Sequence, residues 1–98
     1  MSNPSYYFAK NKYGTINCFT EEENPRLNED SGVWEAGSQV FYIFDPRTLV
    51  PDEIWDKVRE FMKEIPYKDS LYEIRYSVKK NSKYEVELNS ITFNKKNL

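Results

Sequence analysis

Histidine is absent from the chain, and cysteine occurs once, as Cys18. Without histidine the chain lacks the side chain most often used for proton transfer near neutral pH and the commonest metal ligand. A single cysteine excludes an internal disulfide, a thiolate zinc cluster and a dithiol redox pair. We interpret Cys18 as a small apolar packing residue rather than a reactive thiol. We expect no cofactor and no metal site.

Other signatures of catalysis and of membrane insertion are also missing. The 3 glycines are isolated from one another, so no glycine-rich phosphate loop is present. No pair of carboxylates stands apart from the charged surface as a candidate acid and base. No apolar run approaches the ~18 residues that span a bilayer, and the first ten residues do not resemble a signal peptide. We predict a cytoplasmic protein that is not an enzyme, has no catalytic residues and contacts no membrane.

Aromatic residues are abundant and make up 16% of the 98 residues. Their apolar area offsets the entropy of ordering a short chain, which argues against disorder. A chain of this length is sufficient for one core, so residues 1–98 are expected to form a single domain. The prevalence of tyrosine, phenylalanine and isoleucine over leucine and alanine favours strands.

Hydrophobic periodicity locates the elements. Residues 6–10 and 15–20 read as a β-hairpin, because Asn11 and Gly14 between them suit a tight turn. Residues 21–38 show no sustained period and are expected to form a long loop. The continuous apolar run at 39–44 is typical of a central strand covered on both faces.

The clearest element is a helix at 51–65, which begins at Pro51, carries one apolar stripe and ends before Pro66. Two strands with alternating apolar and polar residues follow at 71–79 and 84–93. A β-bulge is expected at Asn89-Ser90, because the apolar residues of the last strand change there from even to odd positions. The predicted fold is α+β: a small, mostly antiparallel five-stranded sheet with one amphipathic helix on one face, in the order β-β-loop-β-α-β-β. The expected core consists of Phe8, Ile16, Phe41, Ile43, Ile54, Trp55, Val58, Phe61, Met62, Ile65, Ile74, Val78, Val86, Leu88 and Ile91.

Negative charge gathers in two parts of the chain. The expected loop contains six acids between positions 21 and 35 against one base, Arg26. In the expected helix, acids recur at i+4 spacing and form one ridge, although like charges at this spacing slightly destabilise a helix. One interpretation of both features is a solvated surface, and the other is a docking surface for a basic partner. A cation site is a weaker alternative, because no calcium-loop pattern is present.

Trp34 lies in the acidic loop, where it could anchor the loop to the core or serve as an exposed interface residue. If the loop and the helix ridge share one face, carboxylates would speed encounter with a basic surface and the tryptophan would supply an apolar anchor. The expected partner-binding residues are Glu21, Glu22, Glu23, Glu29, Asp30, Trp34, Asp52, Asp56, Glu60 and Glu64.

These features favour a non-catalytic binding protein that engages and inhibits a macromolecular partner through an acidic surface. The expected partner is a protein with a basic surface, such as a nucleic-acid-processing enzyme, and the chain would suit a phage or mobile-element anti-defence protein. An immunity protein for a toxin would have the same features. A different alternative is a single-stranded nucleic-acid-binding module, which would use the sheet tyrosines Tyr72, Tyr76 and Tyr84 and the basic C-terminal region.

The charge distribution bears on that alternative. Residues 66–98 contain 4 acids and 7 bases, a net charge of +3, whereas residues 1–65 contain 12 acids and 7 bases, a net charge of −5. The overall charge of −2 argues against nucleic acid as the partner. Unpaired strand edges also predict self-association, as a symmetric homodimer formed by edge pairing or by the outer face of the sheet.

Overall fold

The computed structural model describes residues 5–37 and 50–96. In this part of the chain the architecture is α+β, with one α-helix and six strands, all paired antiparallel. The predicted fold class is therefore confirmed, with four strands in one sheet and two in a second in place of a single five-stranded sheet. The expected strand at 39–44, with Phe41 and Ile43 in the expected core, lies outside the described residues.

The main sheet has the strand order β2-β1-β5-β6. Strands β1 (Ser5–Lys10) and β2 (Ile16–Phe19) form the predicted N-terminal hairpin. Its turn is held by Asn11, whose Oδ1 accepts hydrogen bonds from the backbone N–H groups of Tyr13 and Thr15 at 2.9 and 3.0 Å. β1 also pairs with β5 (Tyr72–Lys80), which in turn pairs with β6 (Val86–Lys95).

The predicted β-bulge in the last strand is confirmed. Ser77 pairs with Ser90, whereas the next residue of β5, Val78, pairs with Leu88. Asn89 is the extra residue, so the apolar positions before and after it stay on one face of the sheet despite their change of parity.

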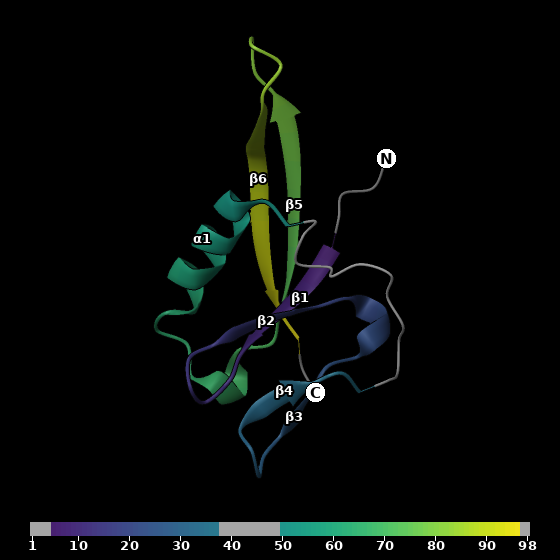
Figure 1. The fold of residues 1–98 in the computed structure, drawn as a ribbon, viewed down its shortest axis with the longest axis vertical. Helices are drawn as coiled ribbons and strands as arrows, with labels where there is room; N and C mark the ends of the chain where they lie inside the picture. The colour runs from purple at the N-terminus through teal and green to yellow at the C-terminus, as the bar shows by residue number, and fades with distance from the viewer. Residues whose placement is uncertain (1–4, 38–49, 97–98) are drawn as a thin grey trace.

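Helix α1 (Asp52–Met62) covers one face of the sheet (Figure 1). Pro51 precedes it, and Asp52 and Glu53 lie in its first turn, where the helix dipole favours negative charge. The helix buries its apolar stripe against side chains of alternate sheet residues. The fully or nearly buried members of this first core are Phe8, Val50, Ile54, Val58, Met62, Ile74 and Tyr76.

A second, smaller unit packs against the β1 part of the opposite face of the sheet. Because side chains alternate along a strand, Tyr7 and Ala9 of β1 point away from the helix. They pack with Phe19, Trp34 and Leu71 in a second core. Trp34 belongs to a short hairpin, β3 (Arg26–Asn28) and β4 (Val33–Glu35), which is preceded by the 3-10 turn η1 (Glu21–Glu23).

The expectation of a long irregular loop at 21–38 is therefore wrong. Gly32, at φ +71°, lies in the tight turn that closes the β3–β4 hairpin, and its N–H donates to the Asn28 carbonyl at 2.8 Å. The two strands are only three residues long, too short to produce a recognisable period in the sequence.

Strands β5 and β6 extend far beyond the rest of the sheet (Figure 1). β1 pairs with β5 only over Tyr72–Arg75. From Tyr76 onward, β5 has no sheet neighbour but β6 among the described residues. We call this two-stranded projection, residues 76–91, the arm. A two-stranded hairpin has little stability of its own, so the arm depends on its base, where Ile54 and Tyr76 belong to the helix-side core.

Candidate functional site

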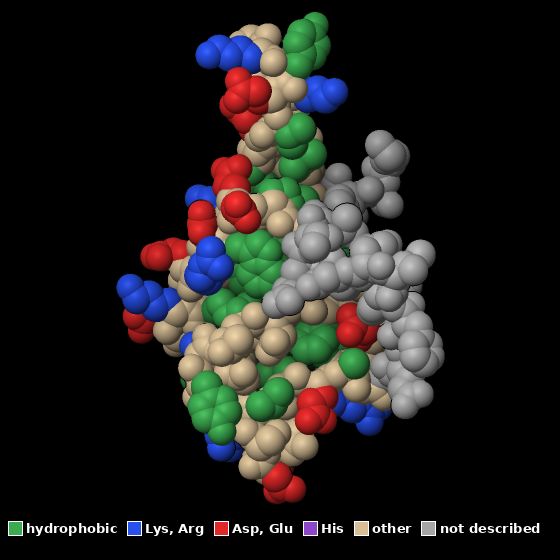
Figure 2. Space-filling view, in the orientation of Figure 1, with side chains coloured by type: hydrophobic (Ala, Val, Ile, Leu, Met, Phe, Trp, Pro, Cys, Tyr) green, Lys and Arg blue, Asp and Glu red, His purple; other side chains and the backbone are tan. Residues whose placement is uncertain are grey.

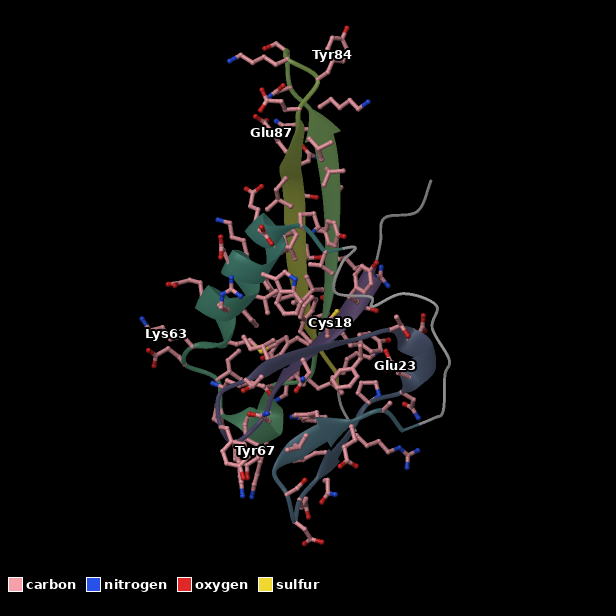
Figure 3. All side chains as sticks on the ribbon, viewed as in Figure 1. Cys18, Glu23, Lys63, Tyr67, Tyr84 and Glu87 are labelled. Atoms are coloured by element: carbon pink, nitrogen blue, oxygen red, sulfur yellow. The ribbon has the colours of Figure 1, made fainter. Side chains whose placement is uncertain are left out.

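The structure separates the two groups of acids that were expected to form one surface. Helix α1 and the β3–β4 hairpin pack on opposite faces of the main sheet. Figure 3 shows the same separation, since Glu23 of η1 and Lys63 at the end of α1 lie on opposite sides of the molecule. The expected combined loop-and-helix patch is therefore wrong, because the loop crosses to the face that the helix does not occupy.

The acids of the former loop differ in their surroundings. Glu21 is exposed, whereas Glu23 is half-buried and accepts a hydrogen bond from the Thr20 backbone N–H at 3.0 Å. Glu23 therefore caps its own 3-10 turn. The side chain of Glu22 lies outside the described part of the structure. Glu29 and Asp30 are exposed at the β3–β4 turn, beside a shallow depression that Lys68 also lines.

Trp34 anchors the β3–β4 hairpin to the body of the protein. It is only 3% exposed, and its Nε1–H donates to the Tyr67 backbone carbonyl at 3.1 Å. Of the two roles considered for this side chain, the structural anchor is confirmed. Its inclusion among the partner-contacting residues is wrong, because the second core covers the indole.

The helix ridge is present as expected. Asp52, Asp56 and Glu60 are exposed on α1, and Glu64 is exposed just beyond the end of the helix. Asp56 forms an ion pair with Arg59 at 2.7 Å, but both side chains are largely in solvent, at 73% and 58% exposure. Exposed pairs of this kind add little stability, but Arg59 offsets the charge of Asp56 in this part of the ridge.

Of the three sheet tyrosines considered for stacking on single-stranded nucleic acid, Tyr72 and Tyr76 are partly or largely buried and Tyr84 is exposed. Tyr76 is 5% exposed and lies under the helix, and Tyr72 is half-buried against Phe61. Tyr76 also stacks on Tyr6, with ring centroids 6.4 Å apart. Burial is the main cause that raises the pKa of both the Tyr6 and the Tyr76 hydroxyl, and the nearby Cys18 thiol adds to the effect.

The most unusual surface is on the arm. Among the described residues, the large hydrophobic side chains classed as exposed are Tyr13, Val78, Tyr84 and Val86, and all but Tyr13 belong to the arm. Val78 is 48% exposed, Val86 63% and Tyr84 82%. Figure 2 shows hydrophobic side chains running along the arm toward its tip. Val78 and Val86 were expected in the core, and that expectation is wrong because the arm extends past the end of the helix.

The tip of the arm holds Tyr84 in a strained conformation. Its backbone has φ +63°, a left-handed value that a bulky residue rarely adopts. Asn81 stabilises this turn, since its Oδ1 accepts from the N–H groups of Lys83 and Glu85 at 2.8 and 3.0 Å. The fold does not need a tyrosine here, because its ring contributes almost no buried area. Gly14 occupies the same left-handed place in the equivalent turn that begins at Asn11.

A small apolar notch lies where the arm meets the start of the helix. It has a volume of about 30 Å³, and Ile54, Val78, Val86 and Leu88 contribute its apolar lining. Glu53 and Glu87 are its charged lining residues, and none of the described residues that line it is basic. In Figure 3, Glu87 lies on the arm just above the start of the helix. We call Val78, Tyr84 and Val86, with Glu53 and Glu87, the arm surface.

Comparison of the chain with protein-family models, with curated proteins and with solved structures finds no significant match. The described residues include no helix with the length and apolar character that crossing a bilayer requires. Function must therefore be argued from the surface itself.

Proposed function

We propose that the protein is a non-catalytic binding module whose arm surface engages a protein partner with a basic surface and inhibits it by covering that surface. The observation that carries the proposal is the exposure of Val78, Tyr84 and Val86 on one projecting hairpin. Apolar side chains gathered on an exposed element, rimmed by charge, are typical of interaction sites. A projecting arm can also reach into a concave partner surface, such as an enzyme cleft.

The side chains suit the two parts of an interface. Tyrosine is enriched among residues that dominate binding energy, because it buries a large ring and keeps a polar hydroxyl. Val78 and Val86 flank the small notch, which has room for the tip of one aliphatic side chain. These residues would form the desolvated centre of the interface. Glu53 and Glu87 would form its rim near the helix, and Lys80 lies beside Val86 on the same face of the arm.

Charge indicates the kind of partner. Glu53 and Glu87 border the notch, and the ridge acids Asp52 and Asp56 continue the negative charge along α1. Carboxylates in this arrangement accelerate encounter with a positive surface and disfavour an acidic one. Enzymes that process nucleic acids present such positive surfaces, so a protein of that class is the partner that we propose.

Three double variants test the proposal, and two of them are matched in charge. Val78→Ser with Val86→Ser removes apolar contact without changing charge, and Glu53→Lys with Glu87→Lys reverses the rim. Glu29→Lys with Asp30→Lys makes the same charge change at the β3–β4 turn and is the control. Each protein serves as bait in a bacterial lysate, and a protein that wild type captures stoichiometrically is then purified for binding kinetics.

The serine variant is expected to weaken binding by about 2 kcal/mol, or about thirtyfold in Kd, from the methyl groups that no longer become buried. The rim variant should slow association and reduce its dependence on salt. The control should bind like wild type. Failure of wild type to capture any partner, or loss of binding only in the control, would contradict the assignment to the arm.

A second candidate rests on the arm tip. Lys79, Lys80 and Lys83 are exposed around Tyr84. Basic residues with one stacking ring can contact single-stranded nucleic acid. A labelled oligonucleotide whose binding weakens steeply with salt and is lost in Tyr84→Ala with Lys83→Ala would favour this candidate over the protein partner.

A further inference from the structure

A larger pocket lies at the other end of α1, away from the arm. It has a volume of about 540 Å³ and opens between the turn that follows β1 and the C-terminal half of the helix. Its main lining side chains are Ile16, Trp55, Met62, Lys10, Arg59 and Lys63. A volume of this size falls within the range of small-molecule sites in proteins.

The apolar part of the pocket is formed by packed side chains. Met62 is fully buried, and Ile16 and Trp55 are half-buried. The Trp55 ring is held edge-to-face against Phe8, with centroids 5.0 Å apart and an angle of 83° between the planes. Because Met62 has no exposed area, Ile16 and the Trp55 ring provide the preformed apolar surface that a ligand body can reach.

The charged residues among those that line the pocket are all basic, and Thr15 is a neutral polar lining residue. Lys10, Arg59 and Lys63 line it, and none of the described residues that line it is acidic. The Lys10 ammonium is fixed by donating to the Met62 carbonyl at 2.7 Å, which leaves two of its three N–H donors for another acceptor. Lys63 is exposed at the end of the helix, where its flexible stem can move (Figure 3).

Arg59 has an acidic neighbour outside the pocket, Asp56, at 2.7 Å. That ion pair is exposed and therefore weak. A ligand carboxylate or phosphate could share the Arg59 guanidinium, which has five N–H donors in a planar fork. The neighbouring ridge acids Glu60 and Glu64 are exposed and are not among the residues that line the pocket.

We propose that this pocket binds a small amphipathic anion, with an apolar body on Ile16 and Trp55 and an anionic head between Lys10, Arg59 and Lys63. The three lining cations select the charge of the head, and the apolar floor selects the body. The site is independent of the arm surface, because the arm meets the opposite end of α1 (Figure 1). Either proposal can fail without the other.

The chain contains two tryptophans, which provide a reporter and an internal control. Trp55 lines the pocket, whereas Trp34 is buried on the opposite face of the sheet. The experiment is a titration of the ¹⁵N-labelled full chain with octanoate, followed by the two indole N–H signals in NMR spectra. Octyl phosphate, octylammonium and octanol are titrated in parallel.

Octanoate is expected to shift the Trp55 indole signal in a saturable way and to leave the Trp34 signal in place. If octyl phosphate binds at least as tightly as octanoate, a phosphate suits the site as well as a carboxylate does. If octyl phosphate binds more weakly than octanoate, the site favours a carboxylate. Octylammonium and octanol should bind at least fivefold more weakly, because neither carries a negative head. Equal binding of octylammonium, or no shift of the Trp55 signal, would overturn the proposal.

Charge variants complete the test. Arg59→Glu with Lys63→Glu should weaken octanoate binding at least fivefold. Lys57→Glu with Lys79→Glu makes the same change in net charge at exposed positions outside the pocket and should leave binding unchanged. Equal weakening in both variants would show a general effect of net charge and would also overturn the proposal. An unchanged Trp34 signal in every variant shows that the fold is intact.

Discussion

The packing of α1 on the sheet predicts the cost of removing one aromatic ring, that of Phe61. This ring stacks on Phe93, with centroids 4.1 Å apart and planes within 8°, and meets Tyr72 edge-to-face at 4.9 Å. Replacing a fully buried phenylalanine with alanine costs about 3–5 kcal/mol. Phe61 is only half-buried, so part of the resulting cavity is open to solvent and the cost should be lower.

For the half-buried ring, two contributions to the free energy of unfolding can be estimated. Each aromatic pair adds about 0.5–1.5 kcal/mol beyond its buried area, and the half-buried apolar surface contributes about 1 kcal/mol more. We expect Phe61→Ala to lower the free energy of unfolding by about 2–4 kcal/mol. Phe61→Leu keeps most of the apolar volume and should cost about 1 kcal/mol.

The assay is urea denaturation followed by circular dichroism, with linear extrapolation of the free energy and comparison of m-values. Val86→Ala is the control, because Val86 is 63% exposed and its truncation should cost less than about 0.5 kcal/mol. A cost below about 1 kcal/mol for Phe61→Ala, or an equal cost for the control, would refute the assigned packing of the helix.

Two further predictions concern buried polar groups. Ser70 is fully buried, and its Oγ accepts a hydrogen bond from the Lys10 backbone N–H at 2.8 Å. Ser70→Ala should therefore lower the free energy of unfolding, measured by urea denaturation, by about 1–3 kcal/mol. Ser82 is exposed, so Ser82→Ala should leave the free energy of unfolding unchanged. Burial raises the pKa of the Tyr6 and Tyr76 hydroxyls above 10.0, so the folded state retains protons that the unfolded state releases. Stability should therefore be intact below about pH 10 and fall as the pH rises through the folded-state pKa values. Between pH 8 and 11 the free energy of unfolding should decline less steeply in the double variant Tyr6→Phe with Tyr76→Phe than in wild type. An identical decline in the two proteins would contradict the assignment.

Much of the main sheet could be predicted because its signals are local. The helical stripe at Ile54, Val58 and Met62 has the α-helical period, and all three side chains are buried. The N-terminal hairpin has its turn residues, and the bulge near Asn89 is visible as a change in the parity of apolar residues. In each case the residues that produce the pattern also form the element.

The arm and the small hairpin could not be predicted, because they depend on how far other elements extend. Alternation correctly places Val78 and Val86 on the helix side of the sheet, but their burial depends on α1 and β1 reaching them, and neither covers them. Likewise, the acids at 21–35 end up away from the helix because Trp34 packs on the opposite face. The Asn28 and Gly32 turn was the one local signal for the β3–β4 hairpin.

Site-specific photo-crosslinking from the arm tip tests the central claim most directly. Tyr84 is 82% exposed, so p-benzoylphenylalanine can replace it without disturbing the core, and exposed Glu29 at the β3–β4 turn is the matched control position. Irradiation of bacterial cells that express each variant should yield one protein crosslinked through position 84 and none through position 29. A partner crosslinked from position 29 and absent from position 84 would contradict the assignment of the arm as the binding surface.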